Sequence, residues 1–159
     1  MKSNVNKTEI LRHSAAHVLA AAVLEMFPEA KFGTGPAVEN GFYYDFDLPR
    51  TLIPEDLPLL EEKMKAIIEA NHLFEKSELK IQNALEHFGK LNQIYKNEII
   101  RDLENEGKTT VTIFKSGRFV DLCSGPHLDS TGEINPDAVK LTKDLQNLRA
   151  QLQASSPQS

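Results

Sequence analysis

The sequence lacks the features that mark secreted, membrane-spanning and nucleic-acid-coating proteins. Its one cysteine, Cys123, allows no internal disulfide, which fits a reducing cytoplasm. No apolar run approaches the roughly 20 residues that a membrane helix needs, and the first seven residues include no apolar core of a signal peptide. The net charge of −5 argues against a protein that coats nucleic acid through charge alone, but it is compatible with a pocket for one end of an RNA. We therefore expect a cytoplasmic protein without membrane contact.

What the sequence does contain is an unusual pair of histidines near its start. His13 and His17 lie within a run of good helix formers that extends from about Thr8 to near Pro28. Residues four apart share one face of a helix, so both imidazoles point the same way. Their neighbours are mostly Ala, Val and Leu, and polar rings are costly to bury without partners. Either the rings are satisfied structurally in the core, or they line a cavity and bind something.

A second group of reactive side chains follows about a hundred residues later. Asp121, Cys123 and His127 surround a Gly-Pro turn. Two His with a Cys and a His could bind zinc, or form a metal-free hydrolytic pocket in which Lys96 or Asp121 helps to orient a water. Cys123 could also act as a nucleophile with a histidine base. Spacing alone does not choose among these three.

The chain is long enough for one domain with a substantial core, and its pattern predicts an α+β fold. We expect a long N-terminal helix and further helices packed on an antiparallel sheet. After the first helix, the pattern predicts a hairpin of 32–38 with 42–47, a helix over 57–71, a strand over 74–81, short helices over 83–91 and 96–103, and a hairpin of 109–114 with 118–122.

The last 25 residues have a different pattern. Asn135-Pro136 is a good helix start, and leucines then recur at alternating steps of four and three, at 141, 145, 148 and 152. We expect a tail over 135–159 that forms a short helix and is disordered from Ala154 onward. The domain itself would then occupy residues 1–134.

Taken together, four motifs resemble the editing domain of bacterial-type threonyl-tRNA synthetases. The motifs are His13-Ser14-Ala15-Ala16-His17, Gly35-Pro36 with the stretch Asn40-Gly41-Phe42-Tyr43-Tyr44-Asp45, Tyr95-Lys96, and the run from Asp121 to His127. Each is weak alone, and together they are specific. The alanyl-tRNA synthetase editing domain shares the layout of two His with a Cys and a His, and the stretch from Asn40 to Asp45 favours the threonyl branch. The resemblance also implies a strand at Leu141, as the alternative to the helix expected from the leucine spacing.

The resemblance implies hydrolysis of seryl-tRNA(Thr), the mischarged product of a threonine site. Carried over by motif, the site would contain His13, His17, Lys96, Asp121, Cys123 and His127. His13 and Lys96 would position the attacking water. His17, Asp121 and His127 would hold the seryl group and the terminal adenosine, and Cys123 would restrict the pocket.

The resemblance also implies which cofactors and partners to expect. The threonyl branch needs no metal, so we expect no cofactor; in the alanyl-like alternative, zinc would be bound by His13, His17, Cys123 and His127. The partner would be the acceptor end of tRNA(Thr) carrying serine. The chain would be a free-standing protein acting in trans, with a separate threonyl-tRNA synthetase, or a fragment of a longer ligase. A non-catalytic module that binds a tRNA end or a protein partner is the alternative of another class.

Overall fold

The computed structural model describes residues 7–33, 37–38, 41–143 and 150–155, and it confirms the α+β fold. The helices are α1 (Lys7–Met26), α2 (Asp56–Ala70), α3 (Ile81–Lys90) and α4 (Ile94–Asn105), with 3-10 turns η2 (Thr131–Glu133) and η3 (Pro136–Ala138). The strands are β1 (Lys31–Phe32), β2 (Ala37–Val38), β3 (Gly41–Asp47), β4 (Glu75–Lys80), β5 (Thr110–Ser116), β6 (Phe119–Leu122), β7 (Leu141–Lys143) and β8 (Ala150–Ser155). Within the described residues, no helix is both long enough and apolar enough to cross a bilayer.

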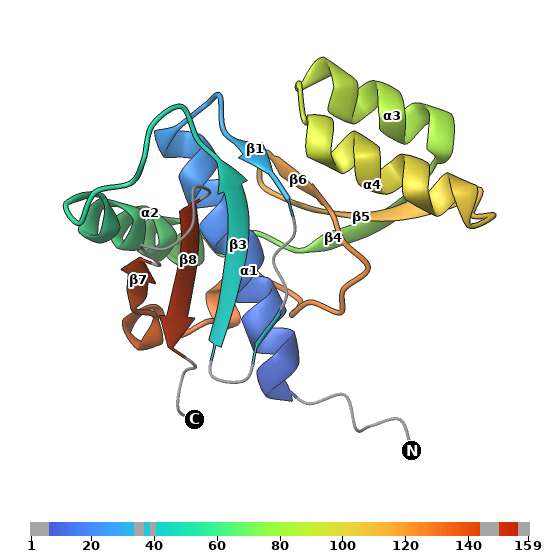
Figure 1. The fold of residues 1–159 in the computed structure, drawn as a ribbon. Coiled ribbons are helices and arrows are strands. Elements are labelled where there is room, and N and C mark those ends of the chain that lie inside the picture. The colour runs from blue at the N-terminus through green and yellow to red at the C-terminus, as the bar shows by residue number, and fades with distance from the viewer. Residues whose placement is uncertain (1–6, 34–36, 39–40, 144–149, 156–159) are drawn as a thin grey trace.

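Helix α1 lies at the centre of the larger core (Figure 1). Its residues from Ser14 to Val23 are all buried, so the helix is covered on every side rather than along one stripe. This is compatible with its sequence because five of these residues are alanines, whose small side chains allow β3 and α2 to approach closely. The aromatic side chains of Phe42, Tyr44 and Phe46 on β3 are buried in the same core.

The two predicted hairpins belong to two different antiparallel sheets. In the first sheet, β3 pairs with both β1 and β2, as expected for 32–38 with 42–47. In the second, β5 lies between β4 and β6. Helices α3 and α4 cover this second sheet with a smaller core that includes Phe88 and Ile100 (Figure 1).

The strand that we predicted to end at Ile81 ends one residue earlier. Ile81 is instead the first residue of α3, and its N–H donates to the carbonyl of Thr109 (3.2 Å). Helices α3 and α4 each begin two residues before the predicted starts.

The tail is where the prediction from sequence was wrong. Leu141 belongs to β7 and Leu152 to β8, and β8 pairs along its length with β3, from Gly41↔Ser155 to Phe46↔Ala150. A short isolated helix is marginal in water, whereas strands at this position continue a sheet that already exists. Ala154 therefore lies in a strand and not in a disordered end. Leu145, Leu148 and 156–159 lie outside the described residues, and the boundary after residue 134 stays a prediction.

We predict that the hydrogen bonds of the Thr131 hydroxyl, which join turn η2 to the end of α2, stabilise the fold. Thr131 is fully buried; its hydroxyl donates to the carbonyl of Ile67 (3.0 Å) and accepts from the N–H of His72 (3.0 Å). Thr131→Val keeps the shape but removes both bonds, so the free energy of unfolding should fall by about 1–3 kcal/mol. Urea denaturation measures this, with Thr110→Val, at an exposed strand position, as the control. Equal stability of the two variants would contradict the prediction.

Candidate functional site

One cavity of about 220 Å³ contains all six side chains that the sequence nominated. They come from segments far apart in the chain: His13 and His17 from α1, Lys96 from α4, Asp121 from β6, and Cys123 and His127 from the loop that follows it. The remaining lining residues are Ala16, Tyr44, Leu122 and Ser124. The structure therefore brings the two histidine-containing motifs and the lysine to one place.

A buried ion pair forms one wall of the cavity. The Lys96 ammonium lies 2.8 Å from Asp121 Oδ1, and both side chains are almost fully buried. Lys96 also donates to the Tyr44 hydroxyl (2.9 Å) and to the carbonyl of Gly33 (2.7 Å). The Tyr44 hydroxyl in turn donates to Asp121 Oδ2 (2.8 Å). An ammonium has three N–H donors, so all three of Lys96 are used within the protein.

This network keeps Asp121 ionised although it is buried. Burial alone would raise the pKa of its carboxyl, but the charges of Lys96 and His17 and the hydrogen bonds from Lys96 and Tyr44 outweigh burial and lower the pKa below its usual value. Burial, followed by the adjacent Asp121 charge, raises the pKa of Tyr44 well above its usual value, so Tyr44 stays protonated and remains a donor.

The three histidines form the other side of the cavity. The ring centroid of His127 lies 5.5 Å from that of His17 and 6.5 Å from that of His13. His17 is buried, its Nε2 lies 2.9 Å from Ser116 Oγ, and its Nδ1 has no partner among the described residues. His13 and His127 are partly exposed, so they are the histidines that an incoming molecule meets first.

All three imidazoles are neutral at pH 7. Burial lowers the pKa of His17 to about 4, with Asp121 opposing this shift and Lys96 adding to it. Burial, then the neighbouring His17, lowers the pKa of His127 to about 3. Burial also lowers the pKa of His13, and Glu9 opposes it. A neutral imidazole has a free lone pair and can accept a proton from water.

The loop after β6 is fixed by contacts at several points. The Ser14 hydroxyl of α1 accepts from the N–H of Leu128 (2.8 Å) and donates to the carbonyl of Ile10 (2.8 Å). At Gly125 φ is +78°, and a Cβ there would lie 2.8 Å from the Phe114 ring, so a side chain at this position would be both strained and too close. These contacts fix the position of His127 relative to α1.

The environment of Cys123 does not activate it as a nucleophile. Its pKa is raised, mainly by burial, although a hydrogen bond from the Gly125 N–H (3.4 Å) opposes the shift. The thiol is therefore protonated at pH 7, and thiolate is the reactive form. This environment favours a role for Cys123 as a wall of the cavity.

Two residues at the site were not nominated from sequence. Tyr44 had been considered as part of a strand and of a family motif but not as a site residue, although its alternation with buried Phe42 and Phe46 could have placed it on the inward face. Ser116 had been assigned to a turn. No sequence signal pairs it with His17, because the contact joins residues 99 apart.

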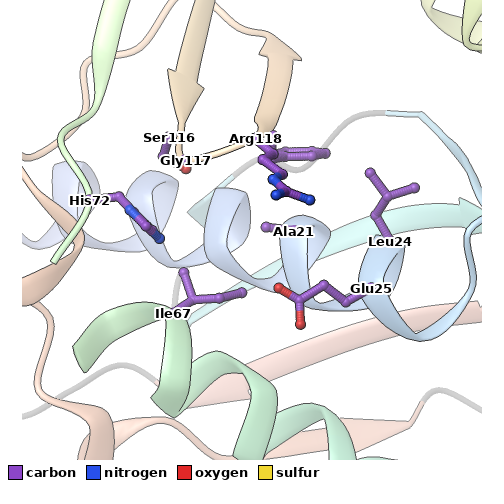
Figure 2. A pocket seen from close by; sticks show the side chains of 9 residues that line it. Ala21, Leu24, Glu25, Ile67, His72, Ser116, Gly117 and Arg118 are labelled. Carbon is purple, nitrogen blue, oxygen red and sulfur yellow. The ribbon is translucent and has the colours of Figure 1, made fainter. Parts of the chain in front are cut away.

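A second, larger cavity of about 530 Å³ lies on the other side of Ser116, between the β5–β6 turn, α1 and α2. Ile67, His72 and Arg118 are among its lining residues, and the charged ends of Arg118 and Glu25 point into it (Figure 2). None of the six nominated residues lines it. Ser116 lines this cavity and contacts a histidine of the smaller one.

The described residues do not fit the zinc alternative. Among them, no three or more His, Cys, Asp or Glu side chains are grouped so that they could hold a metal ion. Of the two ring nitrogens of His17, Nε2 lies against the Ser116 hydroxyl. Independence from metal stays an expectation that an experiment must test.

Comparison with known proteins agrees with the site motifs. Residues 111–153 match the family model described as the threonyl and alanyl tRNA synthetase second additional domain. The chain is similar to threonine–tRNA ligases of Dehalococcoides mccartyi (50% identical over 130 residues, 82% of this chain and 22% of the relative) and Coxiella burnetii (48% over 135 residues, 85% and 20%). The chain is also 49% identical over 126 residues to the threonine–tRNA ligase of Lawsonia intracellularis (79% of this chain and 19% of the relative). The chain spans about a fifth of the length of these relatives.

We predict that acid destabilises the fold through the buried histidines. Since the pKa of His17 is about 4 when folded and near 6.5 when unfolded, the unfolded chain binds more protons between these values. The free energy of unfolding should therefore fall as the pH drops from about 6.5 towards 4, with His127 acting in the same direction. Urea titrations at pH 7, 6 and 5 measure this, and His17→Gln should flatten the dependence. Equal stability at pH 7 and 5 would contradict it.

Proposed function

Because this chain is homologous to the editing-domain region of threonyl-tRNA synthetases, we propose that it is an aminoacyl-tRNA deacylase that hydrolyses seryl-tRNA(Thr). The observation that carries the proposal is the convergence of six sequence-distant polar side chains on one small cavity. Its partner is the acceptor end of a tRNA that carries serine. The chain acts either in trans or as a region of a longer ligase, since it matches only about a fifth of the length of its relatives.

The size of the cavity supports a small aminoacyl group as the bound moiety. Its volume of about 220 Å³ lies below the roughly 300–1,000 Å³ of pockets that enclose drug-sized ligands. A water molecule occupies about 30 Å³, so the cavity has room for a seryl group together with an attacking water. The remainder of the tRNA stays outside, and its phosphates bind elsewhere on the protein.

The chemistry supports base-catalysed hydrolysis by a neutral imidazole. In the proposed reaction, a water held by His13 attacks the ester carbonyl, and its proton passes to the His13 ring. The tetrahedral intermediate then collapses, the ribose oxygen leaves and takes the proton, and serine and tRNA separate. His13 suits this role because it is partly exposed and its lowered pKa leaves it unprotonated.

The geometry constrains the proposed role of Lys96. All three of its N–H groups already have acceptors, so holding a water would require it to release a partner. Without any movement, it contributes a fixed positive charge beside the cavity, which stabilises the negative charge that develops on the ester oxygen. His17, Asp121 and His127 hold the seryl group and the terminal adenosine, and Cys123 limits the depth of the pocket.

Selectivity for serine must come from steric exclusion. Threonine keeps every polar group of serine and adds one methyl, which is worth only about 1–3 kcal/mol in a binding pocket. A second site that admits the smaller side chain and clashes with the larger supplies the remaining discrimination. Residues that line the cavity, such as Ala16 and Leu122, can provide that clash.

We predict that seryl-tRNA(Thr) is deacylated much faster than threonyl-tRNA(Thr), because the extra methyl meets a wall. Release of labelled amino acid from each ester measures the two rates under the same conditions. Equal rates would indicate a nonspecific esterase. No cleavage of either ester, with tRNA binding retained, would favour the non-catalytic binding module.

His13→Ala tests the proposed role of His13 as general base in the same assay. Removing a general base should slow seryl-tRNA cleavage on the order of a hundredfold without changing tRNA binding, to which phosphate contacts contribute most. His72→Ala, in the other cavity, is the control and should retain the rate. A His13 variant as active as the control would move the role of base to another residue.

We predict that hydrolysis does not require a metal ion. Activity should persist after exhaustive treatment with a chelator and dialysis, because the described residues offer no grouped set of metal ligands. Metal analysis of the purified protein accompanies the assay. Stoichiometric zinc, with activity lost in chelator and restored by zinc, would overturn this and favour the alanyl-like alternative.

A further inference from the structure

Strand β5 presents two side chains to the histidines of the site. Phe114 and Ser116 are two residues apart, so they lie on the same face of the strand, and both are buried. Neither lines the small cavity. Each contacts a different histidine that does: Ser116 contacts His17, and Phe114 contacts His127.

The contact between Ser116 and His17 holds the ring of His17 in place. Ser116 Oγ lies 2.9 Å from His17 Nε2, and its side chain has no other hydrogen bond within the described part of the chain. If the hydroxyl donates to Nε2, the hydroxyl proton is satisfied and the ring proton is on Nδ1. If Nε2 donates instead, a buried hydroxyl proton and the Nδ1 lone pair both lack a partner. Each arrangement makes one hydrogen bond and leaves one donor and one acceptor without a partner, so in both the contact holds the ring through Nε2.

The contact between Phe114 and His127 fixes the plane of the second ring. The two rings are stacked, with centroids 4.0 Å apart and planes inclined by 24°. Gly125 allows this approach, since a Cβ there would lie 2.8 Å from the Phe114 ring. Phe74 (5.2 Å between centroids) and His17 (5.5 Å) also contact the His127 ring, but Phe114 is the side chain stacked on its face.

We propose that Phe114 and Ser116 are positioning residues for hydrolysis: Ser116 holds the His17 ring through Nε2, and Phe114 sets the plane of the His127 ring. This inference rests on the proposed function. The two residues act through the histidines and touch no substrate. Both residues lie on β5, the central strand of its sheet, so the rings of His17 and His127 are supported by one rigid element. The loop after β6, which carries His127, would not provide this support alone.

The test compares four single variants of the full chain in the seryl-tRNA assay. Ser116→Ala removes the hydroxyl, and Ser116→Thr keeps it; the second cavity beside Ser116 has room for the added methyl. Phe114→Leu removes the ring but keeps an apolar side chain. Lys115→Ala is the control, because Lys115 lies between them on the strand and is exposed.

We expect Ser116→Ala and Phe114→Leu each to lower kcat about tenfold with little change in KM, as for loss of one orienting contact. Ser116→Thr should retain activity within about twofold, and Lys115→Ala should match the wild type. In a His17→Gln background, Ser116→Ala should have no further effect, because it acts through that ring. Additive losses in the double variant, or an equal loss in Lys115→Ala, would overturn the proposal.

A second measurement does not depend on activity. In ¹⁵N spectra of the imidazoles, the Nε2 signal of His17 should shift in Ser116→Ala, which removes its hydrogen-bond partner, and should stay unchanged in Ser116→Thr. His127 signals should shift in Phe114→Leu only. Unchanged spectra would overturn the proposal even if the enzyme is active. Changed spectra in a protein that cleaves neither ester would support positioning and refute the proposed deacylase activity instead.

Discussion

The buried ion pair between Lys96 and Asp121 is the interaction on which the site depends most. It joins α4 to β6 and, through Tyr44, to the other sheet. Burying two charges costs several kcal/mol per ion unless their remaining groups are hydrogen-bonded. Here the lysine donates to Tyr44 and to the carbonyl of Gly33 and lies 2.8 Å from Asp121 Oδ1, while Asp121 Oδ2 accepts from Tyr44, so each charge has an ionic partner and further hydrogen bonds. Removal of either partner would leave a buried charge, and the wall of the cavity would change with it.

This arrangement divides the cavity into two electrostatically different sides. One side holds fixed charges that remain ionised because they pair with each other. The other holds imidazoles that remain neutral because they are buried. A reaction that takes a proton from water and develops negative charge on an oxygen needs both: lone pairs that accept the proton, and a positive charge that does not move. Polar chemistry is thus confined to a small volume inside a mostly apolar core.

The sequence predicted the fold class and nominated six side chains that line one cavity, but it did not predict the contacts that support them. His13 and His17 were recognisable because helical spacing is regular, and Asp121, Cys123 and His127 because reactive residue types crowd together beside a turn. Tyr44 and Ser116 were missed, since their roles come from pairing with residues 77 and 99 positions away, and local patterns carry no such information. The tail was misread for a related reason. Its leucines fit a helical repeat, but residues 150–155 form a strand because they pair with β3, which is distant in the sequence.

The hydrogen bond from the Leu128 N–H to the Ser14 hydroxyl spans 114 positions of the chain. During synthesis, α1 leaves the ribosome long before the loop that it must meet, and its partner strands β5 and β6 also follow late. Contacts of such large sequence separation form late in folding and slow it. A nascent chain that has made α1, β3 and α2 therefore has two of its histidines in place but no pocket. The pocket closes only after residue 128 has emerged, so the growing chain has no complete pocket before most of this region has been synthesised.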